Sequence, residues 1–585
     1  MSENKPRKVH VETVTRSYKG KVYKSVLLRR TYREGGKVKH ETVGNLSDLS
    51  ADSIDYIKRR LAGESPPVAD AHSFRIVRSL PHGNVAAVLG TAKNIGLDKL
   101  IVSRPCRELQ LVMAMIVDRI ISPGSKLGCT RGMQRETAQN TLAEELRLDD
   151  IDVHELYASM DWLLARQTRI ENKLAKKHLI DGTLVLFDLS SSFSYGRKSE
   201  LVKHGYSRDH RSDRPQITYG LLCDPEGRPV AVEVLPGNTS DPKAFTRIVD
   251  RVRKRFGLKS VVFVGDRGMI TSARINEDLR DVEGLNWISA LRTEGIRKLV
   301  DAGHVDRSLF DERDLAEVTA EELFPGERLV VCRNPILAEE RARKREELLA
   351  ATEEKLEVIV RATQRKKNPL NGEKEIGLRV GKVIGRFKME KHFELTINAD
   401  SFKYTRLIDK ISAEAALDGL YVVRTSVPSS QMGSEQVVET YKSLATVERA
   451  FRSMKTVDLH VRPIFHWNDD RIRAHVFLCM LAYYVEWYMR QRLQEVLYED
   501  NDRESAKALR KSIVAPAVRS ESAKKKDATG STASGLPVQS FQDLLKDLAT
   551  LSRHRIQLTS GGEFQQLTES TTLQRYVLEL LGVVA

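Results

Sequence analysis

The sequence predicts an α/β fold in which a mixed β-sheet forms the centre and helical segments surround it. Three observations support this prediction. Apolar strands and amphipathic helices alternate between residues 181 and 291, helical periodicity dominates residues 51–178, and a basic, strand-like segment occupies residues 1–50. With 585 residues, the chain has room for about three or four domains.

The net charge narrows the class of partner. Lys and Arg total 95 and Asp and Glu total 80, which gives a formal charge of +15. Because phosphate contacts release counterions, a chain this basic often binds a polyanion such as DNA, although some basic proteins have no such partner. The five cysteines have neither zinc-site nor disulfide spacing and are typical of a cytoplasmic protein. The most apolar helical stretch, Val476–Tyr484, is too short to cross a membrane.

Residues 1–50 predict a β-rich basic module. Val26–Tyr32 and Val38–Val43 alternate like strands, and the Gly-containing segment Glu34–Lys37 between them predicts a hairpin. The Lys and Arg side chains of this module either bind a DNA backbone or cover a solvated sheet face, and both interpretations stay open.

Residues 51–178 predict a helical domain. Leu109–Ile121 and Leu156–Leu174 have apolar residues at helical spacing. Two short helical stretches around Gly96, within Asn84–Leu100, loosely resemble a helix-turn-helix. Recognition of DNA ends and plain packing are both open for this domain.

The region that follows predicts the central sheet. Its elements occur in the order strand, strand, strand, helix, strand, helix, strand, which fits a ribonuclease-H-like mixed sheet. The predicted strands are Thr183–Asp188, Gln216–Cys223, Pro229–Leu235, Lys259–Gly265 and Asn286–Leu291, and the helices are Asp241–Phe256 and Ser272–Leu279. We expect this core to occupy residues 179–294 and to resume over residues 418–495.

An insertion interrupts the core over residues 295–417. We expect an α+β subdomain there, with a charged helical arm over Ile336–Arg365. The core then resumes with the strand Asp418–Thr425 and two helices, Ser434–Thr456 and Asp470–Leu493. A Ser-, Ala-, Lys- and Gly-rich flexible linker is predicted over residues 520–540, and a helical region over residues 541–585.

Two carboxylates follow apolar strands of the predicted core. Asp188 ends one strand, and Asp266 directly follows another. An Asp at such a place is most often a cap or turn residue. If the two strands are neighbours, however, both carboxylates converge at one edge of the sheet, where rigid strand ends hold ligands well. A carboxylate pair there suits Mg²⁺, which prefers oxygen ligands.

A third carboxylate lies on a predicted helix. Tyr441, Glu448 and Lys455 follow one another at intervals of seven residues and therefore share a helix face, with Arg452 one turn beyond Glu448. This set suits a phosphate beside a metal ion, because the acid holds the metal and the cations hold phosphate oxygens. An exposed helix stabilised by Glu and Arg pairs explains the pattern equally well.

These motifs resemble the DDE transposases of bacterial insertion sequences. The strand ending in Asp188, the segment Val261–Gly268 and the helix Tyr441–Lys455 match the branch with a large insert before the glutamate and a Y-x2-R-x3-E-x6-K signature. Leu444 departs from that signature, where the family has Arg, and Arg449 or Arg452 is the candidate substitute. The loops Gly205–Asp213 and Pro236–Asp241 also resemble loops of this branch.

The resemblance implies a mechanism and its participants. Asp188, Asp266 and Glu448 would hold two Mg²⁺ ions, or Mn²⁺ in their place, and Tyr441, Lys455, Arg452 and Arg449 would contact DNA phosphate. The enzyme would cleave insertion-sequence ends by hydrolysis and join them to double-stranded target DNA by transesterification, as a homodimer on paired ends, in the bacterial cytoplasm at the nucleoid. The branch also forms DNA hairpins with a flipped base, for which Phe387, Phe393 or Tyr404 is the candidate stacking residue.

Two alternatives stay open on the residues alone. One is a ribonuclease-H-like metal nuclease that cuts without strand transfer, and the other is a transposase remnant that only binds DNA. Retention of all three acids argues against the remnant, and the large insert argues against a simple nuclease. His460, Arg462 and His466 follow the glutamate helix and are weaker candidates for phosphate contacts.

Overall fold

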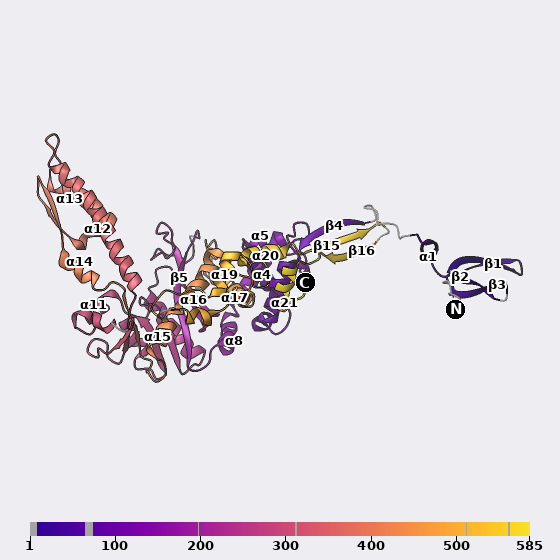
Figure 1. Ribbon diagram of the computed structural model, residues 1–585, viewed down its shortest axis with the longest axis horizontal. Helices are drawn as coiled ribbons and strands as arrows, with labels where there is room; N and C mark the ends of the chain where they lie inside the picture. The colour runs from indigo at the N-terminus through magenta and orange to yellow at the C-terminus, as the bar shows by residue number, and fades with distance from the viewer. Residues whose placement is uncertain are drawn as a thin grey trace. The chain divides into compact units, whose positions relative to one another are not determined.

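The computed structural model describes residues 9–34, 36–64, 74–196, 198–310, 313–510, 512–559 and 562–585. The chain forms two compact units (Figure 1). The smaller comprises Met1–Ser79 with His554–Gln566, and the larger comprises Leu80–Arg553 with Leu567–Ala585.

The smaller unit begins with an antiparallel sheet of β1 (Val9–Tyr18), β2 (Lys21–Glu34) and β3 (Lys37–Asn45). Lys19 and Gly20 join the first two strands with φ angles of 50° and 79°, the positive values that a two-residue hairpin turn requires. The β2–β3 pairing confirms the hairpin expected from the sequence. Helix α1 (Ala51–Leu61) follows, and its first turn is capped by the Ser50 side chain, which accepts from the Ser53 amide.

A second sheet of the smaller unit was not anticipated. It contains β4 (Phe74–Pro81), β15 (Ser552–Leu558) and β16 (Gly562–Leu567) in the order β16-β15-β4. The prediction of uninterrupted helical character over residues 51–178 and 541–585 was therefore wrong at these strands. Their side chains are mostly exposed or half-buried, so the sequence lacks the apolar alternation of a strand with one buried face.

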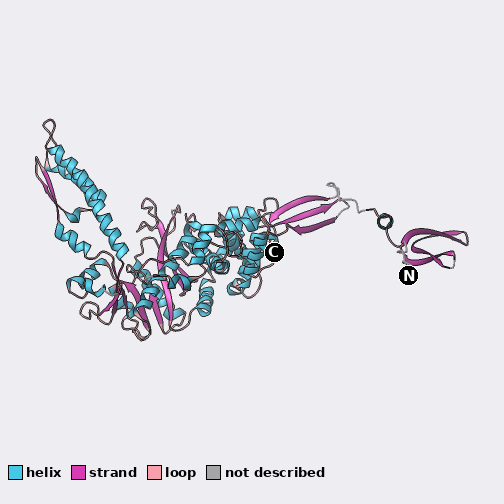
Figure 2. Cartoon of the chain, viewed as in Figure 1, coloured by secondary structure: helices cyan, strands magenta, loops and turns pink. Residues whose placement is uncertain are grey.

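The core of the larger unit is a sheet of eight strands among the described residues, drawn as arrows in Figure 2. Its strand order is β10-β11-β14-β9-β8-β5-β6-β7. The strands are β5 (Thr183–Phe193), β6 (Gln216–Cys223), β7 (Pro229–Pro236), β8 (Val261–Val264), β9 (Leu285–Ala290), β10 (Leu315–Val318), β11 (Arg328–Arg333) and β14 (Leu420–Thr425).

Five of these strands confirm the mixed sheet predicted from the pattern. In the order β7-β6-β5-β8-β9, the pairs of β6 with β5 and β7 are antiparallel, whereas β8 is parallel to both β5 and β9. Crossover helices make the parallel connections possible. These are α9 (Asp241–Asp250) with the π-turn η1 (Arg251–Arg255), and α10 (Ser272–Arg274) with the π-turn η2 (Ile275–Leu279).

The insertion leaves the sheet later than expected. Strands β10 and β11, which we placed in the insertion, extend the central sheet beside β14 through antiparallel pairs. They cover an edge of β14 that would otherwise present unpaired backbone groups. Between β9 and β10 lie α11 (Thr293–Asp301) and the short turn η3 (Arg307–Phe310).

The arm that leaves the sheet has a core of its own. Buried side chains such as Leu349, Leu356, Ile376 and Val380 pack between its two long helices, which lie side by side in Figure 1. Helix α12 accounts for the charged helical arm predicted over Ile336–Arg365, and the second helix, α13, lies outside that range. Its elements are α12 (Pro335–Thr363), α13 (Glu373–Phe387), η4 (Glu390–His392), β12 (Phe393–Ile397), β13 (Phe402–Arg406) and α14 (Ile408–Ala415).

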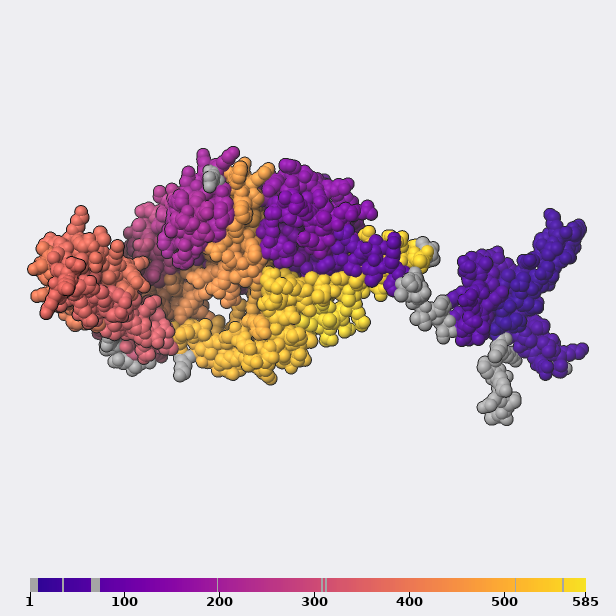
Figure 3. Space-filling view, turned by 90° about the horizontal axis from the view of Figure 1, so that it is seen from above, coloured from indigo at the N-terminus to yellow at the C-terminus, as the bar shows by residue number. Residues whose placement is uncertain are grey.

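A helical layer completes the larger unit. Helices from residues 83–178 pack on the C-terminal helices although the two segments are far apart in the sequence (Figure 3). The layer contains α2 (Gly83–Asn94), α3 (Leu97–Ile101), α4 (Arg107–Ile121), α5 (Lys126–Met133), α6 (Leu142–Leu146), α7 (Val153–Leu164), α8 (Gln167–His178), α17 (Asp469–Leu493), α20 (Phe541–Ala549) and α21 (Thr572–Leu581).

Packing explains the helix pair around Gly96 better than DNA recognition does. Helix α2 is mostly buried and contacts α4, α17, α20 and α21, and α3 has only five residues. The second helix of the pair is thus too short, and the first too enclosed, to lie in a DNA groove.

The segment 520–540 is not the flexible linker that its composition suggested. It contains helix α19 (Glu521–Thr529), and the buried Lys526 ammonium donates to the carbonyl oxygens of Gln494, Leu497 and Glu499. These contacts bind the segment to the end of α17. Helix α18 (Arg503–Ala508) lies between α17 and α19 in the sequence. Of the helices in the described part of the chain, none combines the length and apolar composition of a membrane span.

Candidate active site

The three acids proposed from the sequence line one cavity of about 690 Å³ in the larger unit. Asp188 belongs to β5, Asp266 follows β8, and Glu448 lies on helix α16 (Leu444–Arg452). Tyr441, Arg452 and Lys455 line the same cavity. We call it the acid cavity. Arg449, the remaining phosphate-binding candidate, is exposed and is not among the residues that line it.

The strand register places Asp188 and Asp266 at the same level. Strands β5 and β8 run parallel, with Leu186 opposite Val264, so two further residues along each chain lead to the two aspartates. Neighbouring strands lie about 4.8 Å apart, which keeps the carboxylates close. We expected Asp188 to end its strand, but β5 continues beyond it to Phe193 through its pairing with β6. It is the neighbouring strand β8 that ends and opens the cavity.

Glu448 projects from the exposed side of a helix that packs on the sheet. Val447 and Phe451 are buried, and the Phe451 ring packs edge-on against Tyr219 of β6 with 5.6 Å between ring centroids. Glu448 is exposed to the cavity. The single helix predicted over residues 434–456 is divided into α15 (Ser434–Lys442), α16 and the π-turn η5 (Ser453–Val457). The break falls at Ser443, whose hydroxyl donates to the Thr440 carbonyl oxygen.

Burial and neighbouring acids shift the pKa values of two groups in this cavity. Burial raises the pKa of Asp188 to about 7, and the charges of Asp266 and Glu448 add to the rise. A hydrogen bond from the Leu189 amide (2.7 Å) and the charge of Arg208 oppose it. Burial and the same acids also raise the pKa of Tyr441, so its hydroxyl keeps its proton at neutral pH. A cation entering the cavity relieves this repulsion.

Lys455 is held in place by groups that the sequence did not reveal. Its ammonium forms an ion pair with Asp209 (2.5 Å) and donates to the Ser190 hydroxyl (3.1 Å). The Asp209 side chain is fully buried, and it also forms an ion pair with Arg462. Burial lowers the pKa of Lys455, while the bond to Asp209 opposes that shift. Asp209 therefore positions two cations at one wall of the cavity.

Arg208 is a second cation that the sequence interpretation did not assign. It lines the cavity, and its guanidinium donates to Asp241 at 2.6 Å. His210 of the same loop also lines the cavity. The family resemblance had marked the loops Gly205–Asp213 and Pro236–Asp241 without giving either a role. The density of charge in the first loop was the available signal.

The remaining residues proposed from the sequence lie in several different places. Arg462 lines the acid cavity, whereas His460 and His466 line only a neighbouring one. Leu444, which stands at the family's Arg position, also lines the acid cavity and is largely buried. Of the aromatic residues considered for base stacking, Phe393 is buried in the core of the arm, and Phe387 and Tyr404 pack against that core.

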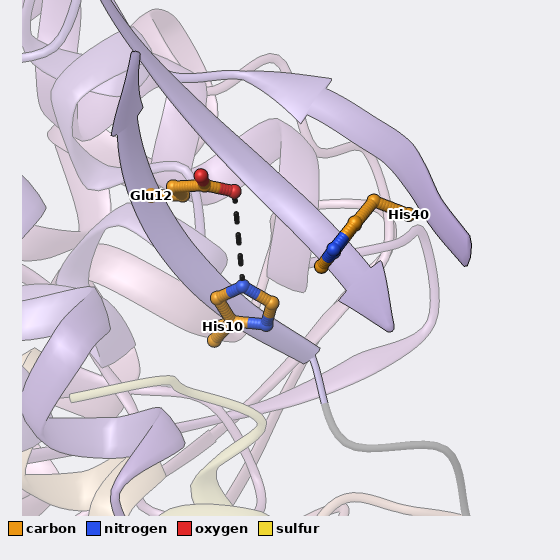
Figure 4. Close-up of side chains that lie close together, drawn as sticks. All are labelled: His10, Glu12 and His40. Atoms are coloured by element: carbon orange, nitrogen blue, oxygen red, sulfur yellow. Dashed lines mark ion pairs between the residues drawn. The ribbon is translucent and has the colours of Figure 1, made fainter. Parts of the chain in front are cut away.

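A group of metal-ligand type lies elsewhere, in the smaller unit. In the described part of the chain, the ligand atoms of His10, Glu12 and His40 lie within 4.8 Å of one another (Figure 4). Two of them already have partners, since Glu12 accepts from Arg29 at 2.9 Å and the His40 ring lies 3.0 Å from the Thr31 hydroxyl.

Comparisons with known proteins agree with this geometry. A family model for the transposase DDE domain matches residues 177–485, and a model for the N-terminal domain of IS1634 family transposases matches residues 11–69. A cryo-EM structure of a piggyBac transposase synaptic complex with hairpin DNA shares 9% sequence identity with this chain, at a TM-score of 0.32, over 80% of this chain and 77% of that chain. That likeness is too weak to support an inference. No curated protein matches the sequence.

Proposed function

Because the chain belongs to the family of transposases with a DDE domain, we propose that Asp188, Asp266 and Glu448 are its catalytic acids. The observation that supports this proposal is their convergence in one cavity with Tyr441 and Lys455. Enzymes of this family act on DNA and use divalent metal ions. We assign two Mg²⁺ ions to the three carboxylates, with Mn²⁺ as a substitute.

The residues present fit a divalent cation. Repulsion among the acids and burial raise the pKa of Asp188, and a bound cation would reverse that cost. When bound, divalent ions polarise a phosphoryl oxygen and favour deprotonation of a water or a DNA 3′-hydroxyl.

The remaining cavity residues position the DNA phosphate. The Lys455 ammonium, held by Asp209 and Ser190, neutralises phosphate charge in a fixed place. The Arg452 guanidinium donates to phosphate oxygens, and the Tyr441 hydroxyl adds a neutral donor. Little covalent chemistry falls to the protein, so orientation and charge neutralisation carry the rate. Leu444 stands where the family signature has Arg, and its buried apolar side chain makes no hydrogen bond to phosphate.

We assign the binding of transposon ends, and the pairing of two such ends, to other parts of the chain. The exposed basic strands β1–β3 and the helical segment that follows are assigned to the transposon end, over the region that matches the IS1634 N-terminal model. The arm α12–α13 is assigned to the second subunit of a homodimer on paired ends. Removing the arm should abolish assembly on paired ends, measured by light scattering, and assembly that persists without it would contradict this assignment.

A strand-transfer assay tests the catalytic proposal. Full-length protein is incubated with labelled duplexes carrying the terminal repeats, unlabelled target DNA and Mg²⁺. Cleaved ends joined to target are the expected products, and cleavage without joining would indicate a nuclease instead. The variants Asp188→Asn, Asp266→Asn and Glu448→Gln should bind the ends but form neither product. Normal cleavage by any of the three would remove that residue from the site.

A further inference from the structure

A second cavity of about 300 Å³ adjoins the acid cavity. It lies between the helical layer and the loop that follows η5, and Arg462 lines both cavities. Its walls come from the α4–α5 connection, from Tyr157 of α7 and from His475 of α17. We call it the cationic pocket. Its positively charged or basic lining residues are Arg119, Lys126, His460, Arg462, His466 and His475.

Two cations of the pocket lack an ion-pair partner, whereas Arg462 is paired with Asp209. Arg119 is 6% exposed and Lys126 is 5% exposed, and neither forms an ion pair within the described residues. The Arg119 guanidinium donates to the Gly124 carbonyl oxygen (2.8 Å), but its Nε has no partner. No Asp or Glu belongs to the described lining of the pocket. The nearby Asp118 is itself hydrogen-bonded to Cys129.

The histidine at the back of the pocket also has an unused ring nitrogen. His475 is 6% exposed, and its Nε2 lies 3.2 Å from the Val461 carbonyl oxygen, whereas Nδ1 has no partner. Helix α5 begins at the mouth with Ser125 as its cap and adds the positive end of a helix dipole. Burial lowers the pKa of His475 well below its ordinary value, so the ring is neutral and its unpaired Nδ1 is an acceptor. The unpaired donor that this pocket offers to an anion is the Arg119 Nε–H group.

This arrangement costs stability unless an anion enters. Burial and the charge of Arg119 lower the pKa of Lys126 to about 8, and burial lowers the pKa of His466 to about 4. A buried cation without an acceptor is unfavourable, and a protein keeps one where a ligand supplies the acceptor. Lys526 shows the alternative, a buried lysine whose ammonium is bound by three carbonyl oxygens.

We propose that the cationic pocket binds a phosphate group, and that this phosphate belongs to the DNA strand whose reacting phosphate lies in the acid cavity. Arg462 lines both cavities and therefore marks the path between the two phosphates. The pocket has room for one phosphate and part of its nucleotide but not for a duplex. The assignment to DNA rests on the proposed function, whereas the assignment to phosphate rests on the pocket alone.

Single-phosphate substitution tests the site. Labelled end duplexes, each with one neutral methylphosphonate, are bound to full-length protein without divalent ions, so that no cleavage occurs. For the unmodified protein, affinity should fall about tenfold at one position besides the reacting phosphate. In Lys126→Met that position should lose its effect while the others keep theirs. An unchanged pattern in Lys126→Met would overturn the proposal.

Lys526→Met is the matched control. It removes a buried lysine with full hydrogen bonding, so it should lower the thermal unfolding temperature and leave the methylphosphonate pattern unchanged. Lys126→Met should maintain or raise the unfolding temperature, because it removes an unpartnered charge. A clear loss of stability in Lys126→Met would assign that lysine a structural role and count against the pocket.

Inorganic phosphate separates the two possible sources of the ligand. At millimolar concentration it should raise the unfolding temperature of the unmodified protein but not of Lys126→Met. Stabilisation by phosphate without a sensitive DNA position would show that the pocket takes free phosphate and would overturn the assignment to DNA. These experiments measure binding and not catalysis. If the strand-transfer assay contradicts the catalytic role of the three acids, the binding results still test the cationic pocket.

Discussion

The acid cavity and the cationic pocket adjoin each other and differ in the charges that line them, since acids and cations line the first and no acid among the described residues lines the second. In the first, burial and neighbouring acids raise the pKa of Asp188, and in the second, burial and a neighbouring arginine lower the pKa of Lys126. Between them, Lys455 and Arg462 share the buried Asp209, whose carboxylate offsets part of their positive charge. Arg462 thus lines both cavities and is held by Asp209.

The largest expected effect is loss of cleavage in Asp188→Asn. Asparagine has nearly the same shape but no negative charge, so cleavage in Mg²⁺ should fall by at least about 1,000-fold. Affinity for the end duplex should stay within about twofold, since the basic segments carry binding. Cleavage is measured on labelled ends in single-turnover conditions. A rate within tenfold of the unmodified protein would show that the first cavity is not the metal site.

The wall between the two sites is tested by Asp209→Asn. This change leaves Lys455 and Arg462 without their shared acceptor, and loss of one partner from a buried pair costs about 3 kcal/mol. The free energy of unfolding in urea should fall accordingly. Asp213→Asn in the same loop is the control, because Asp213 is exposed beside Arg211 and should not change the midpoint. Equal midpoints for both variants would mean that Asp209 is not structural.

A smaller effect separates two arginines on the same helix. Arg452 lines the acid cavity and Arg449 does not, although the sequence made both candidates. Arg452→Ala should lower the cleavage rate about tenfold, the value of one charged hydrogen bond to phosphate, and Arg449→Ala should change it by less than about twofold. Reversal of this order in single-turnover assays would place the phosphate beside Arg449, outside the acid cavity.

The convergence of the acids was predictable because it depends on local rules. Asp188 follows the buried first half of β5 and Asp266 follows β8, and parallel neighbours bring equivalent positions together. The face shared by Tyr441, Glu448 and Lys455 survives the break at Ser443, because that break interrupts the helix for one residue only. The periodicity of the side chains and the order of the strands and helices were sufficient to predict these features.

The missed features depend on contacts between distant segments. Asp209 meets Lys455 and Arg462 only after folding, and no spacing in the sequence marks that meeting. Strands β10 and β11 are short, and their place in the sheet depends on pairing with β14. Likewise, Lys526 is buried in a segment of linker-like composition because carbonyl oxygens at the end of α17 accept its ammonium.

A further expected effect concerns stability rather than rate. The unfolded chain loses the Asp188 proton near its ordinary pKa of about 4, whereas the folded protein holds it until about pH 7. Asp188 therefore destabilises the fold increasingly as pH rises from about 4 to about 7, and Asp188→Asn removes that penalty. In the absence of metal, the variant should be more stable than the unmodified protein by about 4 kcal/mol at pH 8, and equally stable near pH 4. Adding Mg²⁺ should stabilise only the unmodified protein. A difference that does not vary with pH in urea unfolding would mean that the acid cavity has no charge imbalance for a metal to correct.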